Sequence, residues 1–236
     1  MHGQREGSGE TQAGAATAPG SVTAHGTTPG HSAYRADIDG LRAVAVIMVL
    51  VFHTGISPLR GGFIGVDIFF VISGYLITKQ IWEELSKGTF SIGRFYERRI
   101  RRIFPGLAVM TAVVMACAPF LLFPAEIRTT AITAVTALAS FSNLYLLATT
   151  WGTGGYFSTD AVSQPLLHTW SLGVEEQFYL AFPLILALFG SRSLKAARLA
   201  ALLFGALCFA FGVWFTYVNR DAAYYFPLSR AWELVC

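Results

Sequence analysis

The 236-residue chain is 54% apolar and only 13% charged, and its formal net charge is +3. A soluble domain carries about 25% charged residues. The apolar residues here fall in runs close to the roughly 20 residues that cross a bilayer as a helix. Composition therefore excludes an ordinary soluble domain and predicts an all-α, polytopic bundle of transmembrane helices in a lipid bilayer. Nucleic-acid binding is disfavoured, because apolar runs flank the main basic patch on both sides.

Residues 1–33 are rich in Gly, Ala, Thr and Ser and contain almost no large apolar side chains. Such a segment cannot bury enough surface to offset the entropy lost on ordering. We predict a disordered cytoplasmic tail here. It is not a secretory signal peptide, because it has no apolar central stretch. The membrane-embedded domain is expected to cover residues 34–236.

Six apolar runs follow in that domain. They are 41–56, 63–82, 103–123, 129–148, 166–189 and 200–218. Between them we expect a polar, basic loop over 83–102 and a glycine-rich loop from Trp151 to about Gln164. Residues from Arg230 onward have the pattern of a further helix start, so we expect the membrane domain to be incomplete at its C-terminus.

The distribution of positive charge predicts the orientation. By the positive-inside rule, the Arg94–Arg102 patch is cytoplasmic. The N-terminus is then cytoplasmic too, and the protein is expected to reside in the inner (cytoplasmic) membrane. Residues 149–165 carry no Lys or Arg, whereas 190–198 carry three. Strict alternation puts these two connections on the wrong sides. Either one segment between residues 103 and 148 does not cross fully or the charge rule fails locally, and we favour the first, because the run 129–148 is Thr-rich and only moderately apolar.

Arg42 and His53 lie eleven residues apart on the first run. Eleven steps of about 100° bring them within about 20° of one helix face, with a rise of about 16 Å. Ionisable groups at such depth usually face a cavity or a partner. One interpretation is a boundary arginine and a hydrogen-bonded structural histidine. The other is functional: a neutral imidazole accepts the proton of an attacking hydroxyl, and the arginine holds phosphates of a soluble donor.

The second run contains small residues that allow close helix packing, and this is the expected role of Gly65 and Gly74. Asp67 is a lone carboxylate near the outer end of the run. A partner is expected for a charge at this depth. The hypothesis is that Asp67 orients His53 or Arg42.

The basic patch includes a cluster of four arginines, Arg98, Arg99, Arg101 and Arg102. One interpretation is a topology anchor that binds anionic lipid headgroups. The other is a binding site for donor phosphates, whose oxygens suit the forked guanidinium group. Both interpretations are compatible with one another.

The head of the fifth run carries polar residues at helical spacing. His168, Ser171, Glu175 and Tyr179 share a face, and Glu176 adds a second carboxylate. Such a face either shapes the acceptor side of a reaction or forms a hydrogen-bonded structural seam. No metal site is expected. The three cysteines (Cys117, Cys208 and Cys236) show no metal-ligand or disulfide spacing, and no serine-hydrolase elbow or zinc-binding HExxH motif occurs.

Five of these features, taken in order, resemble the acyltransferase 3 family, and in particular its bacterial O-antigen acetylase branch. They are Asp39–Ala43, the Arg42–His53 spacing, Gly61–Tyr75, Arg98–Arg102 and Trp170–Tyr179. The resemblance covers residues 34–236. It implies about ten membrane helices, of which about six are present, with a cytoplasmic acyl-CoA donor and an extracytoplasmic acceptor. It also implies His53 as catalytic base and Arg42 with the arginine cluster as donor-binding residues.

The predicted function is a membrane-bound O-acyltransferase. It would move an acyl group, acetyl by default, from acyl-CoA to a hydroxyl of a cell-envelope carbohydrate or lipid-linked glycan, with no permanently bound cofactor. His53, Asp67, Glu175 and Glu176 are the candidate catalytic residues. His168, Ser171 and Tyr179 are the candidate acceptor-binding residues. Two rivals stay open: a transporter in which His53 and Asp67 relay protons, and an inactive fragment.

Overall fold

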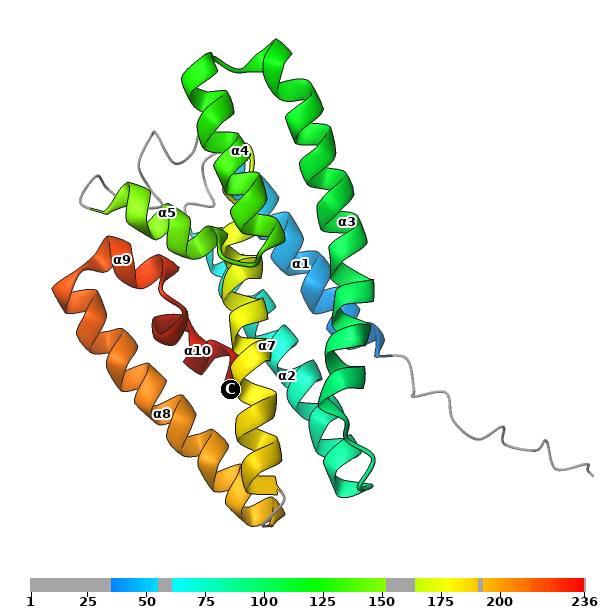
Figure 1. The fold of residues 1–236 in the computed structure, drawn as a ribbon. Helices are drawn as coiled ribbons and strands as arrows, with labels where there is room; N and C mark the ends of the chain where they lie inside the picture. The colour runs from blue at the N-terminus through cyan, green and yellow to red at the C-terminus, as the bar shows by residue number, and fades with distance from the viewer. Residues whose placement is uncertain (1–34, 55–60, 152–163, 191–192, 236) are drawn as a thin grey trace, which may run out of the picture. The chain divides into compact units, whose positions relative to one another are not determined.

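The computed structural model describes residues 35–54, 61–151, 164–190 and 193–235, and this part of the chain contains helices and no strand (Figure 1). The helices are α1 (Ala36–His53), α2 (Ile64–Ser86), α3 (Ile92–Leu121), α4 (Pro124–Leu138), α5 (Ser142–Thr150), α7 (Thr169–Gly190), α8 (Leu194–Val218), α9 (Arg220–Tyr225) and α10 (Pro227–Val235). Four of them, α2, α3, α7 and α8, are long and apolar enough to cross a membrane. The predicted all-α membrane bundle is confirmed, although six crossing segments were expected.

Two of the expected spans differ for identifiable reasons. Helix α1 has only 18 residues, and three of them are charged (Asp37, Asp39 and Arg42), so it offers no 18-residue stretch as free of charge as those in the four apolar helices. The run 129–148 is split between α4, of 15 residues, and α5, of 9. At about 1.5 Å per residue, neither piece reaches across the roughly 30 Å hydrocarbon core. Neither α4 nor α5 is among the helices long enough to cross a membrane, in agreement with the expectation for this run.

The break between α4 and α5 falls at Ser140, whose φ of 62° turns the chain. Helix α7 holds this turn through Gln177, which donates hydrogen bonds to the Ser140 carbonyl and to Oδ1 of Asn143, both at 2.8 Å. Gly173 permits the approach, because a Cβ there would lie 2.7 Å from the same Asn143 oxygen. Gln177 of α7 thus supplies a hydrogen-bond donor to a backbone carbonyl at the break between the two helices.

The predicted loop over 83–102 is wrong. Helix α2 continues to Ser86, and α3 begins at Ile92, so the basic cluster is helical. Arginine and glutamate are good helix formers, and the Glu97–Arg101 pair, 2.8 Å apart at i,i+4 spacing, supports the helix. The predicted tail, 1–33, and residues 152–163 of the predicted glycine-rich loop lie outside the described residues.

Both basic connections lie at one end of the bundle. The end of α2 and the start of α3 lie near the end of α7 and the start of α8 (Figure 1). Arg198 of α8 stacks over the ring of Trp82 of α2, with its guanidinium carbon 4.9 Å from the ring centroid. Connections that share one end of the bundle are what the positive-inside rule predicts for two basic segments.

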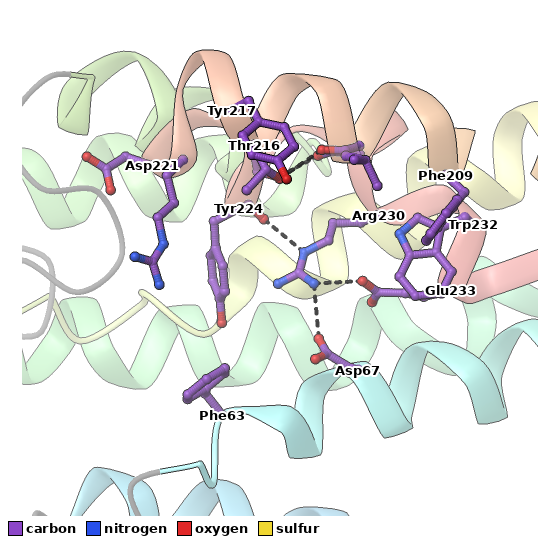
Figure 2. A pocket seen from close by; sticks show the side chains of 15 residues that line it. Phe63, Asp67, Phe209, Thr216, Tyr217, Asp221, Tyr224, Arg230, Trp232 and Glu233 are labelled. Carbon is purple, nitrogen blue, oxygen red and sulfur yellow. Dashed lines mark hydrogen bonds and ion pairs between the residues drawn. The ribbon is translucent and has the colours of Figure 1, made fainter. Parts of the chain in front are cut away.

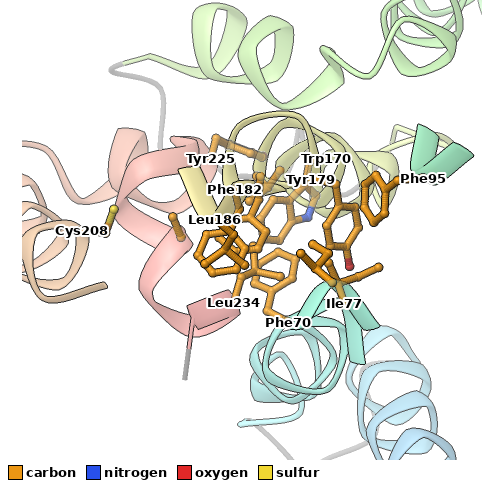
Figure 3. Close-up of a cluster of buried hydrophobic side chains, with 14 of the residues drawn as sticks. Phe70, Ile77, Phe95, Trp170, Tyr179, Phe182, Leu186, Cys208, Tyr225 and Leu234 are labelled. Atoms are coloured by element: carbon orange, nitrogen blue, oxygen red, sulfur yellow. The ribbon is translucent and has the colours of Figure 1, made fainter. Parts of the chain in front are cut away.

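The core lies where α2, α7, α8 and α10 meet, and it contains buried side chains from all four helices (Figure 3). Phe70, Trp170, Tyr179 and Phe182 are almost completely buried there. Two glycines let the helices approach. A Cβ at Gly65 would lie 2.5 Å from the Ala45 carbonyl of α1, and one at Gly74 would overlap the Leu234 backbone of α10. The predicted packing role of both glycines is confirmed.

Candidate functional site

A cavity of about 460 Å³ opens between α1, α2, α3 and α7, near the basic end of the bundle. It brings together six residues that the sequence singled out, from three separate helices. They are Arg42, Arg98, Arg99, Arg102, Glu175 and Tyr179. We refer to it as the arginine cavity. Its volume falls within the roughly 300–1,000 Å³ of small-molecule sites.

Arg99 is the most firmly held of these arginines. Its Nη2 donates to Glu176 Oε1 at 3.1 Å, and its guanidinium carbon lies 3.9 Å from the centroid of the Tyr179 ring. Its Nε is buried and has no hydrogen-bond partner within the described residues. A buried donor without a partner costs free energy. Arg99 is therefore fixed by α7 and retains a donor for a ligand.

The other cavity arginines differ in how far they are neutralised. Arg98 pairs with Glu84 at 2.7 Å, and Arg42 lies 3.7 Å from Asp39. Arg102 forms no ion pair with any described residue. Three of the four cavity arginines thus have a carboxylate partner, and Arg102 is left without one among the described residues.

Arg101 differs from the arginines that line the cavity. Its side chain is 79% exposed and pairs with Glu97, and it does not line the arginine cavity. At about 100° per residue, it points well away from its neighbour Arg102. The geometry therefore separates Arg101 from Arg98, Arg99 and Arg102, which line the cavity, and its predicted role in donor binding stays a prediction.

Glu175 and Glu176 also lie with the arginines. Glu175 lines the cavity, and the hydroxyl of Tyr179 donates to its Oε2 at 3.5 Å. Glu176 pairs with Arg99. Both carboxylates therefore lie beside the arginines, and their role in catalysis or acceptor binding stays a prediction. Of the four residues on the predicted helix face, Glu175 and Tyr179 are joined by a hydrogen bond.

His53 is the last residue of α1, and Arg42 lies near the other end of the same helix. Its Nδ1 lies 2.8 Å from the Val49 carbonyl. Because a carbonyl oxygen only accepts hydrogen bonds, Nδ1 carries the proton in the neutral ring, and Nε2 keeps a lone pair. This is the tautomer that a general base requires at Nε2.

His168 lies near His53, in the turn that precedes α7. Partial burial, and then the nearby positive charge of His53, lower the pKa of His168. Its Nε2 lies 3.1 Å from the sulfur of Met110. Ser171 donates to the His168 carbonyl at 3.1 Å and lines neither the arginine cavity nor the second cavity described below.

Asp67 has a partner, as expected, but it is neither His53 nor Arg42. Arg230 of α10 donates to Asp67 Oδ1 at 3.2 Å and to Glu233 Oε1 at 2.6 Å. The sequence reasoning missed both Arg230 and Glu233. The available signal was an Arg and a Glu three residues apart in a segment with helix-start pattern, which places both on one face.

These features define a multi-pass membrane protein with a basic cavity at one end of its helices and a histidine pair beyond it. The family model described as an acyltransferase domain, acyltransferase 3, matches residues 35–233, so the chain belongs to this family. The resemblance seen in the sequence is confirmed.

Curated relatives agree with this assignment. The chain is 36% identical over 201 residues to BcsY of Komagataeibacter xylinus, whose name describes it provisionally as a membrane-bound transacylase; the match covers 84% of this chain and 49% of BcsY. It is 36% identical over 208 residues to the peptidoglycan O-acetyltransferase OatA of Listeria monocytogenes, covering 86% of this chain and 33% of OatA. It is 39% identical over 155 residues to the O-acetyltransferase OatA of Staphylococcus aureus, covering 65% and 25%.

The chain thus spans half or less of the length of these relatives. No solved structure matches it.

Proposed function

We propose that this chain forms the donor-binding part of a membrane-bound O-acyltransferase. The enzyme transfers an acyl group, acetyl in the first instance, from acyl-CoA to a hydroxyl of a cell-envelope carbohydrate. The family assignment supports acyl transfer, and the names of two relatives support acetyl as the group. The word peptidoglycan in one of those names supports a glycan acceptor.

The observation that carries the proposal is the arginine cavity. Arg42 comes from α1, and Arg98, Arg99 and Arg102 come from α3, yet all four line one space. Guanidinium forks bind phosphate oxygens through paired, charge-assisted hydrogen bonds. The unpartnered Nε of Arg99 and the unneutralised Arg102 supply donors for such a group. Coenzyme A carries several phosphates, so it suits this cavity.

The proposed orientation places the arginine cavity at the cytoplasmic face, where coenzyme A thioesters occur. It rests on the two basic connections that share one end of the bundle. The N-terminus then lies in the cytoplasm, and the membrane is the inner membrane.

The proposed chemistry joins the two ends of α1. Arg42 and His53 are separated by a rise of about 16 Å, a span that an extended pantetheine arm bridges. The acceptor hydroxyl oxygen attacks the thioester carbonyl while Nε2 of His53 takes its proton. The new ester bond forms as the carbon–sulfur bond breaks, and the leaving thiolate receives a proton from the imidazolium. This step needs no cofactor.

The direct test follows coenzyme A in membranes that contain the protein. Radiolabelled acetyl-CoA is supplied on the cytoplasmic side with a cell-envelope extract as acceptor. We expect free coenzyme A and labelled, base-labile glycan in equal amounts. Uptake of a solute without release of coenzyme A would instead indicate the transporter.

Replacing Arg102 by glutamine should weaken donor binding. A charge-assisted hydrogen bond contributes about 1.5–3 kcal/mol, so we expect KM for acetyl-CoA to rise about tenfold or more. Arg101→Gln is the matched control, since Arg101 is 79% exposed and lies outside the cavity. It should leave KM within about twofold.

The lipid alternative gives a different result. If the cavity holds an anionic headgroup, Arg102→Gln would change the dependence on anionic lipid, and adenosine 3′,5′-bisphosphate would not compete. Equal KM values for Arg102→Gln and Arg101→Gln in neutral lipid would contradict the donor assignment.

A further inference from the structure

A second cavity, of about 420 Å³, lies between α2, α8, α9 and α10 (Figure 2). Its wall includes Asp67, Arg230 and Glu233 together with the rings of Tyr217, Tyr224 and Trp232. No residue of the arginine cavity belongs to it. Asp67 comes from α2, Arg230 and Glu233 come from α10, and α9 adds Arg220 and Asp221 to the wall. Figure 2 shows Arg230 between Asp67 and Glu233.

The charged cluster has an unused hydrogen-bond acceptor. Two carboxylates share the single guanidinium of Arg230, which also lies 4.6 Å from the Tyr224 ring centroid. Glu233 is only 3% exposed, and its Oε2 has no hydrogen-bond partner within the described residues. A buried polar atom without a partner costs about 1–3 kcal/mol, and more when charged. A ligand that donates a hydrogen bond to this oxygen removes that cost.

Aromatic rings supply the other half of the wall. Trp232 packs edge-on against Phe209 at 5.1 Å between centroids. Tyr217 is 88% exposed at the edge of the cavity. Tyrosine and tryptophan combine an apolar face with a polar group. A wall of rings and hydrogen-bonding carboxylates suits a ligand with an apolar face and several hydroxyl groups.

The cavity also approaches the end of α1 where His53 lies. Phe63 lines the cavity, and its ring centroid is 5.8 Å from that of Phe52. The Phe52 ring in turn packs edge-on against His53, with centroids 5.5 Å apart. Two successive ring contacts, Phe63 with Phe52 and Phe52 with His53, therefore connect the cavity wall to the histidine.

We propose that this second cavity binds a sugar ring of the acceptor, with Glu233 Oε2 accepting a hydrogen bond from a ring hydroxyl and Tyr217 or Trp232 packing against the ring face. Arg230 holds both carboxylates in place for this contact. The inference rests on the proposed function, because that function requires a hydroxylated acceptor near His53. It adds where the acceptor lies and which residues recognise it.

The test measures sugar binding without any acyl donor. The protein is reconstituted in lipid nanodiscs and titrated with a β-1,4-linked tetramer of N-acetylglucosamine, and binding is followed by tryptophan fluorescence and by calorimetry. We expect saturable binding that weakens at least tenfold in Glu233→Gln. Glu97→Gln is the matched control, because it makes the same change at an exposed ion pair, and its affinity should equal that of the parent.

A second variant guards against misfolding of Glu233→Gln. Tyr217→Ala removes a mostly exposed ring, so the fold should persist while sugar affinity falls. Failure of the parent to bind the tetramer would overturn the inference, as would parental affinity in both variants. Coenzyme A release, measured in parallel, separates the two proposals: intact release without sugar binding overturns this inference alone, whereas sugar binding without release overturns the acyl transfer.

Discussion

Replacing His53 by alanine should lower the rate of acyl transfer about 10²- to 10⁴-fold, the range that a general base contributes. The bond from Nδ1 to the Val49 carbonyl leaves Nε2 as the basic nitrogen. Alanine has no group that removes the proton of the attacking hydroxyl. The measurement is label transfer from acetyl-CoA in membranes, at matched protein level.

Donor binding should persist in the His53→Ala variant, because the arginine cavity does not include His53. The KM for acetyl-CoA should therefore stay near the parental value while kcat falls. His31→Ala makes the same change in the N-terminal segment, outside the described residues, and should transfer at the parental rate. A His53→Ala protein with full activity would remove the assignment of His53 as the base.

The second large effect concerns the contact between α2 and α10. Gly74→Ala should lower the melting temperature of the purified protein by about 5–12 °C. A Cβ at this position would lie 2.7 Å from the Cα of Leu234 and overlap its carbonyl oxygen. Overpacking costs about 1–3 kcal/mol, and each kcal/mol shifts the melting temperature by about 2–4 °C at this chain length. We expect the upper part of this range, because backbone rather than a flexible side chain must move.

Gly106→Ala is the control for this substitution. Gly106 is also helical, in α3, but a Cβ there meets nothing within 4 Å. Alanine is the better helix former by about 1 kcal/mol, so the melting temperature should stay the same or rise. Equal melting temperatures for the two variants would show that α2 and α10 do not pack as closely as described.

The local pattern of apolar residues predicted the helices well, because few backbone conformations are stable in lipid. Backbone groups in the hydrocarbon region must bond within the segment, so an apolar run of sufficient length forms a helix. The same geometry predicts that Arg42 and His53 share a face and lie about 16 Å apart along α1. Small residues such as Gly65 and Gly74 correctly predicted where helices pack closely.

The sequence-based predictions of helix boundaries failed at two segments where polar residues determine the secondary structure. The basic cluster from Arg94 to Arg102 was assigned to a loop because it is charged, yet it forms the first turns of α3. The apolar run 129–148 was assigned as one segment, yet it breaks at Ser140. That break depends on Gln177 of α7, which is 37 residues away in the chain and so lies outside any local window.

The sequence by itself determined helix geometry, and helix geometry predicts on which face of a helix, and how far along its axis, each candidate residue lies. Only the tertiary structure decided which residues are their partners. Asp67 pairs with Arg230, 163 residues later, and Arg99 pairs with Glu176, 77 residues later. Partners depend on which helices become neighbours. That choice is made by long-range packing, such as the fit of Gly74 against Leu234, and periodicity within one helix carries no information about it.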